Sequence, residues 1–590
     1  MKKISDFVKK HPIYSALIIN LAFLIAVILF GDMKYEVSDD FVMDTILSGA
    51  YGAKYDAHLL FSNMILGYGL KLLYMIFPVV SWYFVMHIVL CFVSLTVISA
   101  ILLCKKSDVW GIYLTILFVS FFSDDLYLLV QFTKTATVCI MAGGLLLLYS
   151  YWNIKSKKKY LAGAFGIVLC LIGAMVRSAC INMVLPFLVL VYIGIVIKQK
   201  FDKKLMVKAV LGVALCGLVV LGAYKLWDVD SYLWARYPEY QEYRVKNAQR
   251  ASITDIGGYD GQVVLDKIAQ MEGCTIEDYF TLISWNFVDQ SVYTPERLSE
   301  FADVFHTDAN QTNHSIKNII LALKDRHYER YTVVWAIIIL LIITLAFRKT
   351  KGWYAIIDIG LALGLLAYLE YSGRILYRVE YGIFFCLAVV FLWQLVSAEN
   401  MQEVKLGRLA TALIVLLLVA KIPLYIPDTS YKTMSVDEYN QYVYDVFYES
   451  WNFKLEKYRA CVNKRPVYDE LITQMENDSE HYYLCDFSST IQLLYYHYKP
   501  WLRLPMGYYR DTYSYLGGVT TYYPSCHETW AYNGLDYYNP YSTIANDNIL
   551  IVDNYYQLTK INYYKQYYDA EAEEELVGTC GYFNIWKIRP

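Results

Sequence analysis

The stretch that decides the fold runs from Ile13 to Thr45, IYSALIINLAFLIAVILFGDMKYEVSDDFVMDT. Its first part is apolar and long enough to cross the hydrocarbon core of a bilayer as one helix. Two adjacent carboxylates, Asp39 and Asp40, follow soon after, with a third at Asp44. Acids at such a position are often simply solvated, so the residues around them decide the interpretation.

The composition of the chain is that of a membrane protein. Of its 590 residues, 57% are hydrophobic and only 18% are charged, and a formal net charge of −3 predicts no nucleic-acid partner. The twelve cysteines lack the CxxC pairs typical of zinc or iron–sulfur sites. We therefore predict a polytopic α-helical membrane protein with about 11 transmembrane helices, over 13–31, 81–103, 109–123, 135–151, 160–176, 180–197, 205–226, 331–347, 353–370, 380–397 and 408–425.

Basic residues predict the orientation of these helices. Short cytoplasmic loops accumulate Lys and Arg, and every second loop here is basic: MKKISDFVKK, CKKSD, NIKSKKK, KQKFDKK, RKTKG and QEVKLGR. The amino terminus is therefore predicted to be cytoplasmic, and the chain to be a multi-pass protein of the cell membrane. The alternate segments are predicted to face outward: 32–80, 124–134, the turn at Arg177, 227–330, 371–379 and everything after about 426.

Two outer regions are too long to be simple connections. Residues 227–330 hold polar sequence compatible with helices. Within 426–590, HYYLCDF and NILIVDN have the pattern of short buried strands, each followed by a helix-like stretch, and GTCGYFNIWKIRP ends as a strand after a Gly turn. We predict a transmembrane module over 1–425 and a small α/β extracytoplasmic domain over 426–590.

A poor membrane span follows the acidic stretch. Residues 53–77, AKYDAHLLFSNMILGYGLKLLYMIF, are apolar at helical spacing but interrupted by polar side chains. We expect an amphipathic helix that lies along the outer surface of the membrane and covers the carboxylates. Such a cover restricts water, which strengthens the interaction of a carboxylate with a developing charge. His58, in this segment, is a candidate substrate-binding residue.

Four basic residues are predicted to be outside, against the usual bias: Lys134, Arg177, Arg374 and Arg378. Positive charge in short outer loops is disfavoured, so these residues need a partner. Arg374 and Arg378 are four residues apart and share a face if the turn is helical, a geometry able to clamp a phosphate.

Outer carboxylates, outer cations and an interfacial helix together suit a lipid-linked phosphate that carries a sugar. The tail of such a donor stays in the bilayer, the cations stabilise the departing phosphate, and a carboxylate accepts a proton from the attacking hydroxyl. We predict sugar transfer from a polyprenyl-phosphate donor to an extracytoplasmic acceptor, namely a cell-envelope glycan, teichoic acid, glycolipid or protein. The predicted setting is a bacterial membrane, with membrane lipids as further partners.

The order of these features resembles the GT-C class of integral-membrane glycosyltransferases, which includes protein O-mannosyltransferases, aminoarabinose transferases and oligosaccharyltransferases. The resemblance covers the architecture of the whole chain, and its sharpest motif is the dipeptide Asp39-Asp40. It implies that Asp40 or Asp39 is catalytic, with a slight preference for Asp40. It also implies that Arg374 and Arg378 bind the donor phosphate, a role that we extend to Arg177 and Lys134.

Other residues near these positions are candidates for further roles. The resemblance places Asp124 and Asp125 where oligosaccharyltransferases have a second acidic motif that helps to hold a divalent metal, Mg or Mn. The pair lacks the DxD spacing of that motif, so a metal is an option that the sequence does not require. Glu370 and Tyr371, just before the arginine pair, are candidate substrate-binding residues.

Two other functions remain open at this point. A flippase or transporter of lipid-linked sugars would place ionisable residues near the middle of the membrane, whereas the predicted spans are nearly free of charge there. A polymerase or ligase of the O-antigen type also uses outer arginines, but such enzymes usually lack a sizeable carboxyl-terminal domain.

Overall fold

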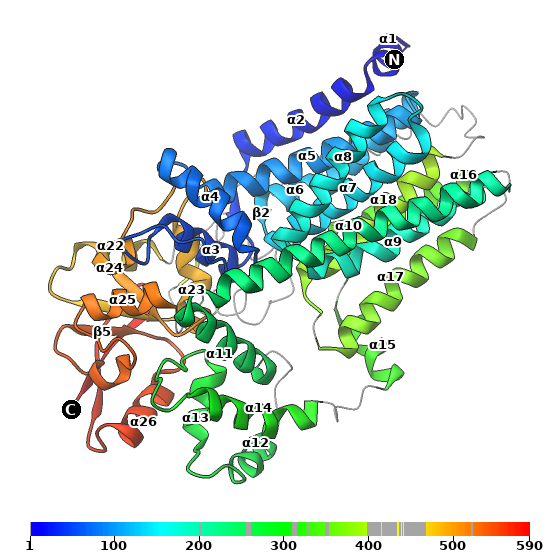
Figure 1. Ribbon diagram of the computed structural model, residues 1–590. Coiled ribbons are helices and arrows are strands. Elements are labelled where there is room, and N and C mark those ends of the chain that lie inside the picture. Colours follow the sequence, from blue (N-terminus) through cyan, green and yellow to red (C-terminus); the bar gives the residue numbers. More distant parts are fainter. Residues whose placement is uncertain are drawn as a thin grey trace.

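The fold is seen in a computed structural model (Figure 1). It describes residues 2–199, 202–254, 261–309, 315–326, 328, 331–347, 353–373, 375–397, 415, 433–435, 438, 441, 468–520 and 523–590. Arg374, most of the predicted span 408–425 and the first part of the predicted outer domain lie outside the described residues.

Long apolar helices dominate the described chain. Nine of the described helices are long and apolar enough to cross a membrane. A tenth, α16, is shorter but equally apolar, so ten of the eleven predicted spans coincide with described helices, and the prediction of a polytopic helical protein is confirmed. The ten are α2 (Pro12–Phe30), α5 (Trp82–Lys105), α6 (Val109–Leu128), α7 (Phe132–Asn153), α8 (Lys158–Val176), α9 (Ala179–Ile197), α10 (Lys203–Ala235), α16 (Thr332–Phe347), α17 (Trp353–Tyr371) and α18 (Tyr377–Val396).

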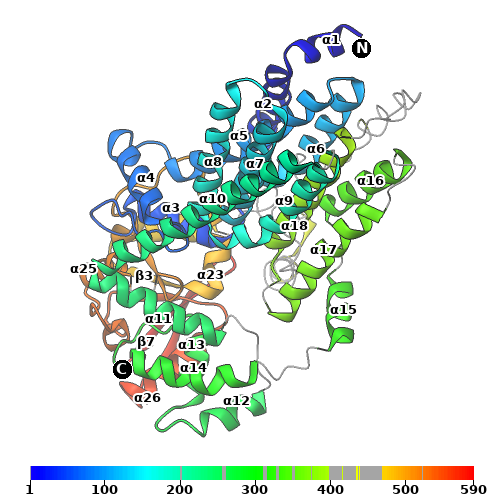
Figure 2. The same cartoon turned by 45° about the vertical axis from the view of Figure 1, so that its right-hand side comes forward.

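The centre of this bundle is formed by α7 and α18, nearly all of whose residues are buried. Helix α7 packs closely on α8, and glycines at the contact make this possible. A Cβ atom added to Gly143 would lie 2.6 Å from the carbonyl oxygen of Gly166, and a Cβ atom added to Gly166 would lie 2.7 Å from the carbonyl oxygen of Gly143. Small residues of this kind allow helix backbones to approach each other in a membrane. Helices α16 and α17 lie beside α18 (Figure 2).

The predicted inner and outer loops gather at opposite ends of the bundle. At one end, which we call the basic end, Lys198 Nζ donates to the Ser397 carbonyl oxygen at 2.7 Å, and Lys105 Nζ lies 4.2 Å from the ring centre of Trp393. Helix α1 (Lys2–Lys10) is also at this end, whereas the carboxyl-terminal sheet lies beyond the other end (Figure 1). We call the other end the site end. The cytoplasmic position of the basic end remains a prediction.

Shorter helices cover the site end. They are α3 (Ser38–Ser48), α4 (Met64–Ile76), α11 (Pro238–Thr254), α12 (Gly261–Ile268), α13 (Ile276–Ile283), α14 (Pro295–Ala309) and α15 (Ile316–Asp325). The helix expected over 53–77 is longer than the one in the structure, because α4 begins only at Met64. The Asn63 side chain accepts a hydrogen bond from the Ile65 N–H at 3.0 Å. Asn63 thus caps the helix, and the residues before it form a loop.

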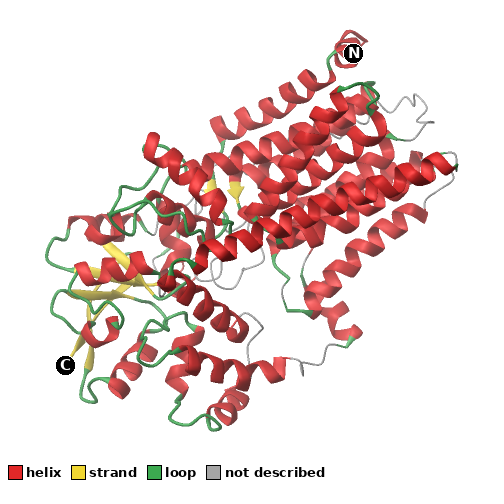
Figure 3. Cartoon of the chain, viewed as in Figure 1, coloured by secondary structure: helices red, strands yellow, loops and turns green. Residues whose placement is uncertain are grey.

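The carboxyl-terminal region holds a five-stranded sheet, whose strands are yellow in Figure 3. We refer to residues 468–520 and 523–590 as the cap. Its strands run in the order β4-β3-β5-β7-β6, with the first three parallel and the last two antiparallel to their neighbours. Its elements are α22 (Asp469–Asn477), β3 (Tyr482–Asp486), α23 (Phe487–Leu494), η5 (Tyr495–His497), α24 (Tyr508–Asp511), β4 (Tyr513–Leu516), α25 (Pro524–Tyr532), η6 (Pro540–Thr543), β5 (Ile549–Val552), α26 (Gln557–Tyr567), β6 (Glu573–Cys580) and β7 (Phe583–Arg589).

The strand predictions for the cap are confirmed. HYYLCDF contains β3 and NILIVDN contains β5, and each strand is followed by a helix, α23 and α26. The final stretch GTCGYFNIWKIRP lies in the hairpin of β6 and β7. The pattern of short apolar runs with helical segments between them therefore identified a small α/β domain.

The cap packs directly on α3. The backbone N–H groups of Gly507 and Tyr509 donate to the carbonyl oxygens of Gly49 and Ala50, each at 2.9 Å. Gly49 ends α3 in the left-handed conformation, with φ of 75°, which favours glycine. The cap and the acidic helix are therefore joined by main-chain hydrogen bonds.

Candidate active site

Helix α3 carries the acidic pair in its first turn, since it begins at Ser38. Backbone N–H groups at a helix amino terminus favour negative charge, so the position suits Asp39 and Asp40. The segment before α3 is fixed by β1 (Lys34–Tyr35), which pairs in parallel with β2 (Leu129–Val130) next to the start of α7. The two carboxylates are thus held at the site end of the bundle.

The Asp40 side chain is fully buried. Its Oδ1 accepts hydrogen bonds from the Tyr83 hydroxyl at 2.9 Å and from the Phe132 N–H at 3.0 Å. Its Oδ2 is buried and accepts no hydrogen bond from the described residues. Burial raises the pKa of the Asp40 carboxyl well above its ordinary value, and the bond from Tyr83 only partly offsets this effect.

Asp39 differs from its neighbour because it is partly exposed, at 22% of its side chain. Its Oδ2 lies 3.9 Å from Nη2 of Arg378, a side chain in the first turn of α18 that is itself 20% exposed. The structure thus brings together a predicted catalytic acid and a predicted phosphate-binding arginine that lie far apart in the sequence. Both remain accessible to a substrate.

Arg177 lies near the same carboxylates. It follows α8, and its guanidinium carbon is 5.4 Å from the ring centre of Phe132 and 5.7 Å from that of Phe61. These two rings stack on each other, with centres 5.7 Å apart. Because the backbone of Phe132 also holds Asp40, one residue links Arg177 to the acidic pair. Arg177 is only half-buried, so it too can reach a ligand.

Lys134 has a different environment from the one that the sequence predicts. Its side chain is completely buried, and its ammonium lies 2.7 Å from Glu36 Oε2 and 2.6 Å from Asp125 Oδ1. Asp125 also accepts a hydrogen bond from the Tyr377 hydroxyl. A cation already paired with two carboxylates is poorly placed to bind a phosphate, which disfavours the predicted role of Lys134. We call these four residues the Lys134 network.

The same network bears on the metal hypothesis. The ammonium of Lys134 occupies the place beside Asp125 where a metal would have to bind, and Asp124 is buried next to it in α6. Among the described residues, no group of three or more His, Cys, Asp or Glu side chains could hold a metal ion. The residues around Asp124 and Asp125 therefore do not fit Mg or Mn.

His58 lies in the loop before α4 and not on the helix that the sequence predicts. Its Nδ1 is 2.6 Å from Asp56 Oδ1, and its ring stacks on Tyr240 with centres 3.7 Å apart. Burial alone would raise the pKa of Asp56, but its hydrogen bonds with His58 and Tyr240 outweigh this effect and lower the pKa below its ordinary value. These contacts tie the loop to α11, so the geometry gives His58 a structural position.

The end of α17 holds the remaining candidates. Glu370 is half-buried and Tyr371 is 53% exposed, at the end of α17 and the start of the turn that leads to Arg374, which is not described. A buried ion pair that the sequence does not predict lies nearby, where Arg326 Nε and Nη2 donate to Glu380 at 2.6 and 2.7 Å.

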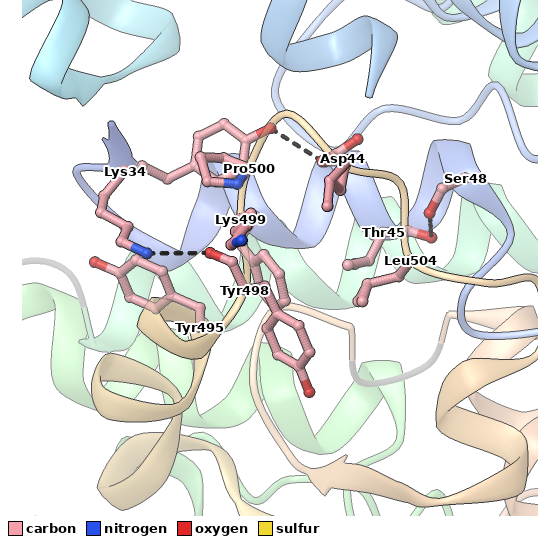
Figure 4. A pocket seen from close by; sticks show the side chains of 12 residues that line it. Lys34, Asp44, Thr45, Ser48, Tyr495, Tyr498, Lys499, Pro500 and Leu504 are labelled. Carbon is pink, nitrogen blue, oxygen red and sulfur yellow. Dashed lines mark hydrogen bonds between the residues drawn. The ribbon is translucent and has the colours of Figure 1, made fainter. Parts of the chain in front are cut away.

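A second buried carboxylate lies one turn along α3. Asp44 accepts hydrogen bonds from the hydroxyls of Tyr74 at 2.5 Å, Ser81 at 2.9 Å and Tyr35 at 3.0 Å. Burial raises the pKa of Asp44 to about 6, even though these hydrogen bonds oppose the effect. Figure 4 shows Asp44 in a narrow cavity between α3 and the cap, which is also lined by Lys34, Tyr498 and Lys499.

One solved structure to which the chain is similar is that of ArnT from Cupriavidus metallidurans in the apo state. The match covers 96% of this chain and 97% of that chain, with 11% identity and a TM-score of 0.47. ArnT is a GT-C aminoarabinose transferase, one of the enzyme types that the sequence resembles. Neither the protein-family models nor the curated proteins gave a match.

Proposed function

We propose that this protein is a membrane glycosyltransferase that moves a sugar from a polyprenyl-phosphate donor to an acceptor hydroxyl outside the cell. The observation that carries the proposal is the partly exposed ion pair of Asp39 with Arg378, next to a fully buried Asp40 at one end of a membrane bundle. A base beside a cation is the arrangement needed when a proton leaves one reactant and negative charge develops on the other.

The reaction forms one bond and breaks one bond at the anomeric carbon. The acceptor oxygen attacks this carbon and gives its proton to a carboxylate, while the bond from the carbon to the phosphate oxygen breaks. The lipid phosphate departs with the electron pair of that bond. Arg378 and Arg177 are the cations placed to stabilise the charge on the phosphate, and the lipid tail stays in the bilayer.

The burial of the two acids favours Asp39 as the base. The sequence slightly favours Asp40, but the described side chain of Asp40 has no exposed surface and its Oδ1 is held by Tyr83 and Phe132. A catalytic base must reach its proton within hydrogen-bond distance. We therefore assign proton acceptance to Asp39 and assign to Asp40 the positioning of α3.

The ion pair of Asp39 also links donor binding to the chemical step. A donor phosphate that binds Arg378 competes with Asp39 for the same guanidinium. Donor binding therefore changes the partner of the carboxylate that we assign as the base.

Transfer assays on the purified protein test the acid assignments. With a panel of polyprenyl-phosphate sugars as donors, we expect Asp39→Asn to lower turnover by at least about 100-fold with donor affinity retained. Asp40→Asn is expected to lower turnover less. Asp228→Asn, an exposed carboxylate on α10, is the matched control and should leave transfer unchanged. Unaltered transfer in both Asp39→Asn and Asp40→Asn would remove the proposal.

Donor titrations test the cations. We expect Arg378→Gln and Arg177→Gln to weaken binding of a polyprenyl-phosphate sugar, because each removes a phosphate partner. Arg236→Gln, an exposed arginine at the end of α10, is the control. Arg374 lies outside the described residues, and a loss of donor affinity in Arg374→Ala stays a prediction from its spacing. Donor affinity that is unaltered in Arg378→Gln would exclude the phosphate role.

A flippase is the competing proposal, and the same protein tests it. The paired ionisable residues of the late helices lie toward the ends of the bundle, as with Asp358, which accepts from Gln394 at 2.6 Å, and Glu380. A transporter instead needs polar groups along a path through the membrane. In sealed liposomes, movement of labelled donor without any transfer would favour the flippase.

A further inference from the structure

A second cavity opens at the basic end of the bundle, far along the helices from the acidic pair. It has a volume of about 540 Å³ and lies at the start of α10, against the end of α7. Its lining combines three lysines with an aromatic and two aliphatic side chains: Tyr151, Lys203, Lys204, Val207, Lys208 and Leu211. The proposed sugar transfer does not use this cavity.

Within the part of the chain that the structure describes, no carboxylate lies within ion-pair distance of the three lysines of this cavity, Lys203, Lys204 and Lys208. The nearest acid in the sequence, Asp202, caps α10, because its Oδ1 accepts from the Leu205 N–H at 2.6 Å. Like charges around one concave surface raise the local positive potential and attract an anion.

Aromatic residues hold the cationic wall in place. Lys208 Nζ lies 4.2 Å from the ring centre of Trp152 and 5.5 Å from that of Tyr151. The Tyr151 hydroxyl donates to the Lys208 carbonyl oxygen at 2.8 Å, and the Tyr192 hydroxyl donates to the Ala209 carbonyl oxygen at 2.5 Å. Tyr and Trp are the residues typical of the membrane–water interface. Their presence beside the lysines fits a position of the cavity near the membrane–water interface.

The floor of the cavity continues into an apolar surface along α10. Val207 is 54% exposed, Leu211 is 58% exposed and Leu218 is 66% exposed. Their spacing of four and seven residues puts them on one face of the helix. A ligand with a phosphate at one end and hydrocarbon chains at the other would match both parts, whereas a soluble anion would use only the first.

We propose that this cavity binds one anionic phospholipid, with its phosphate among Lys203, Lys204 and Lys208 and its acyl chains along the exposed face of α10. Each lysine near a membrane surface attracts an anionic headgroup, so three together select an anionic lipid over a zwitterionic one. The site is separate from the donor site, because the cavity and the acidic pair lie at opposite ends of the bundle. The proposal therefore stands independently of the proposed function.

Native mass spectrometry of the purified full chain tests the site. Phosphatidylglycerol and phosphatidylcholine with the same acyl chains are titrated in turn, and the first bound equivalent is measured. We expect the wild type to prefer phosphatidylglycerol by about 10- to 100-fold, and the triple variant Lys203→Gln, Lys204→Gln, Lys208→Gln to lose most of this preference. Unfolding temperatures measured on both proteins show that the triple variant is folded.

A matched control variant distinguishes a defined lipid-binding site from a general effect of positive charge at this end of the bundle. Lys3, Lys9 and Lys10 are exposed lysines of α1 at the same end of the bundle but outside the cavity, and their triple Gln variant should keep the preference. An equal loss in the two triple variants would overturn the proposal, as would an unchanged preference in the cavity variant. Displacement of the lipid by equimolar inorganic phosphate would also overturn it, because a soluble anion would then be the ligand.

Discussion

Two buried lysines, one in the bundle and one in the cap, each lie between two buried carboxylates. Lys134 contacts Glu36 and Asp125, and Lys560 contacts Asp486, at 2.6 Å, and Asp553. All of these side chains are almost completely removed from solvent. The chemistry is the same in the two places, so the difference between them depends on what surrounds each trio.

The surroundings of the two lysines point to different roles. Glu36 lies just before α3. Tyr377 donates a hydrogen bond to Asp125 and directly precedes Arg378. The Lys134 network therefore joins the segment that carries the acids to helix α18, which carries the arginine. Lys560 lies at the carboxyl ends of β3 and β5, where open α/β sheets commonly bind ligands. There Asn286 Nδ2, from the segment between α13 and α14, donates to Asp486 Oδ2 at 2.8 Å. The Lys134 network therefore joins elements of the candidate site, whereas the Lys560 trio is covered by Asn286.

The largest expected effect is that of Lys134→Met. It leaves Glu36 and Asp125 buried without their cation, which should cost about 3–5 kcal/mol of unfolding free energy. Transfer per folded molecule should also fall at least tenfold, because Asp39 and Arg378 lose their common support. Denaturant titration and transfer assays on the purified protein measure the two effects. Unchanged transfer in the folded fraction would mean that the network is structural only.

Lys560→Met should cost a similar amount of stability, about 3–5 kcal/mol, because Asp486 and Asp553 then remain buried without a partner. The expected difference lies in function, since transfer per folded molecule should stay near that of the wild type. Lys565→Met, an exposed lysine on the same helix α26, is the matched control for stability. A specific loss of transfer in Lys560→Met would mean that the cap trio also takes part in the site.

Asp44 gives a pH dependence that does not involve either lysine. Its pKa of about 6 in the folded protein is higher than its ordinary value, so the folded state holds this proton more tightly. The stability contributed by the protonated carboxyl is fully present below about pH 4 and is lost as the pH rises to about 6, a change of about 3 kcal/mol. Unfolding measured across this range should lose that step in Asp44→Asn. The exposed Glu571→Gln variant should keep it.

The smallest expected effects come from removing one hydrogen bond from each of the two lysine trios. Tyr377→Phe removes the hydroxyl that donates to Asp125, and Asn286→Ala removes the amide that donates to Asp486. Each should cost about 1–3 kcal/mol, since each leaves a buried charged group with one bond fewer. Only Tyr377→Phe should also weaken donor binding, through the adjacent Arg378. Equal donor affinities in the two variants would contradict this distinction.

Local patterns predicted most of the fold. Ten helices follow from apolar runs, and the cap strands follow from short buried runs, because hydrophobic periodicity reports burial over a few residues. The start of α4 was predicted too early, since apolar spacing does not mark where a helix begins. Asn63, a residue type that favours helix caps, was the available signal.

The candidate site was predicted less completely. The sequence singles out the acidic pair and Arg378, because charge at the end of a membrane helix stands out against an apolar background. Their roles stay predictions. Tyr83 and Tyr377 could not be found in this way, because nothing in the sequence separates these two tyrosines, which contact Asp40 and Asp125, from the other copies among 58. Glu36 and Asp125 flank Lys134 only in the folded chain, and such pairing is set by packing between distant segments.

The contact between the cap and the segment just before α3 has a consequence for the order in which the protein is synthesised. Lys34 Nζ donates to the Tyr496 carbonyl oxygen at 2.9 Å, a bond that spans 462 residues of sequence. The ribosome therefore makes the acidic helix long before the part of the cap on which it rests. A chain that has not yet reached the cap therefore carries the acids without this support, so α3 takes its final position only after the cap has been made.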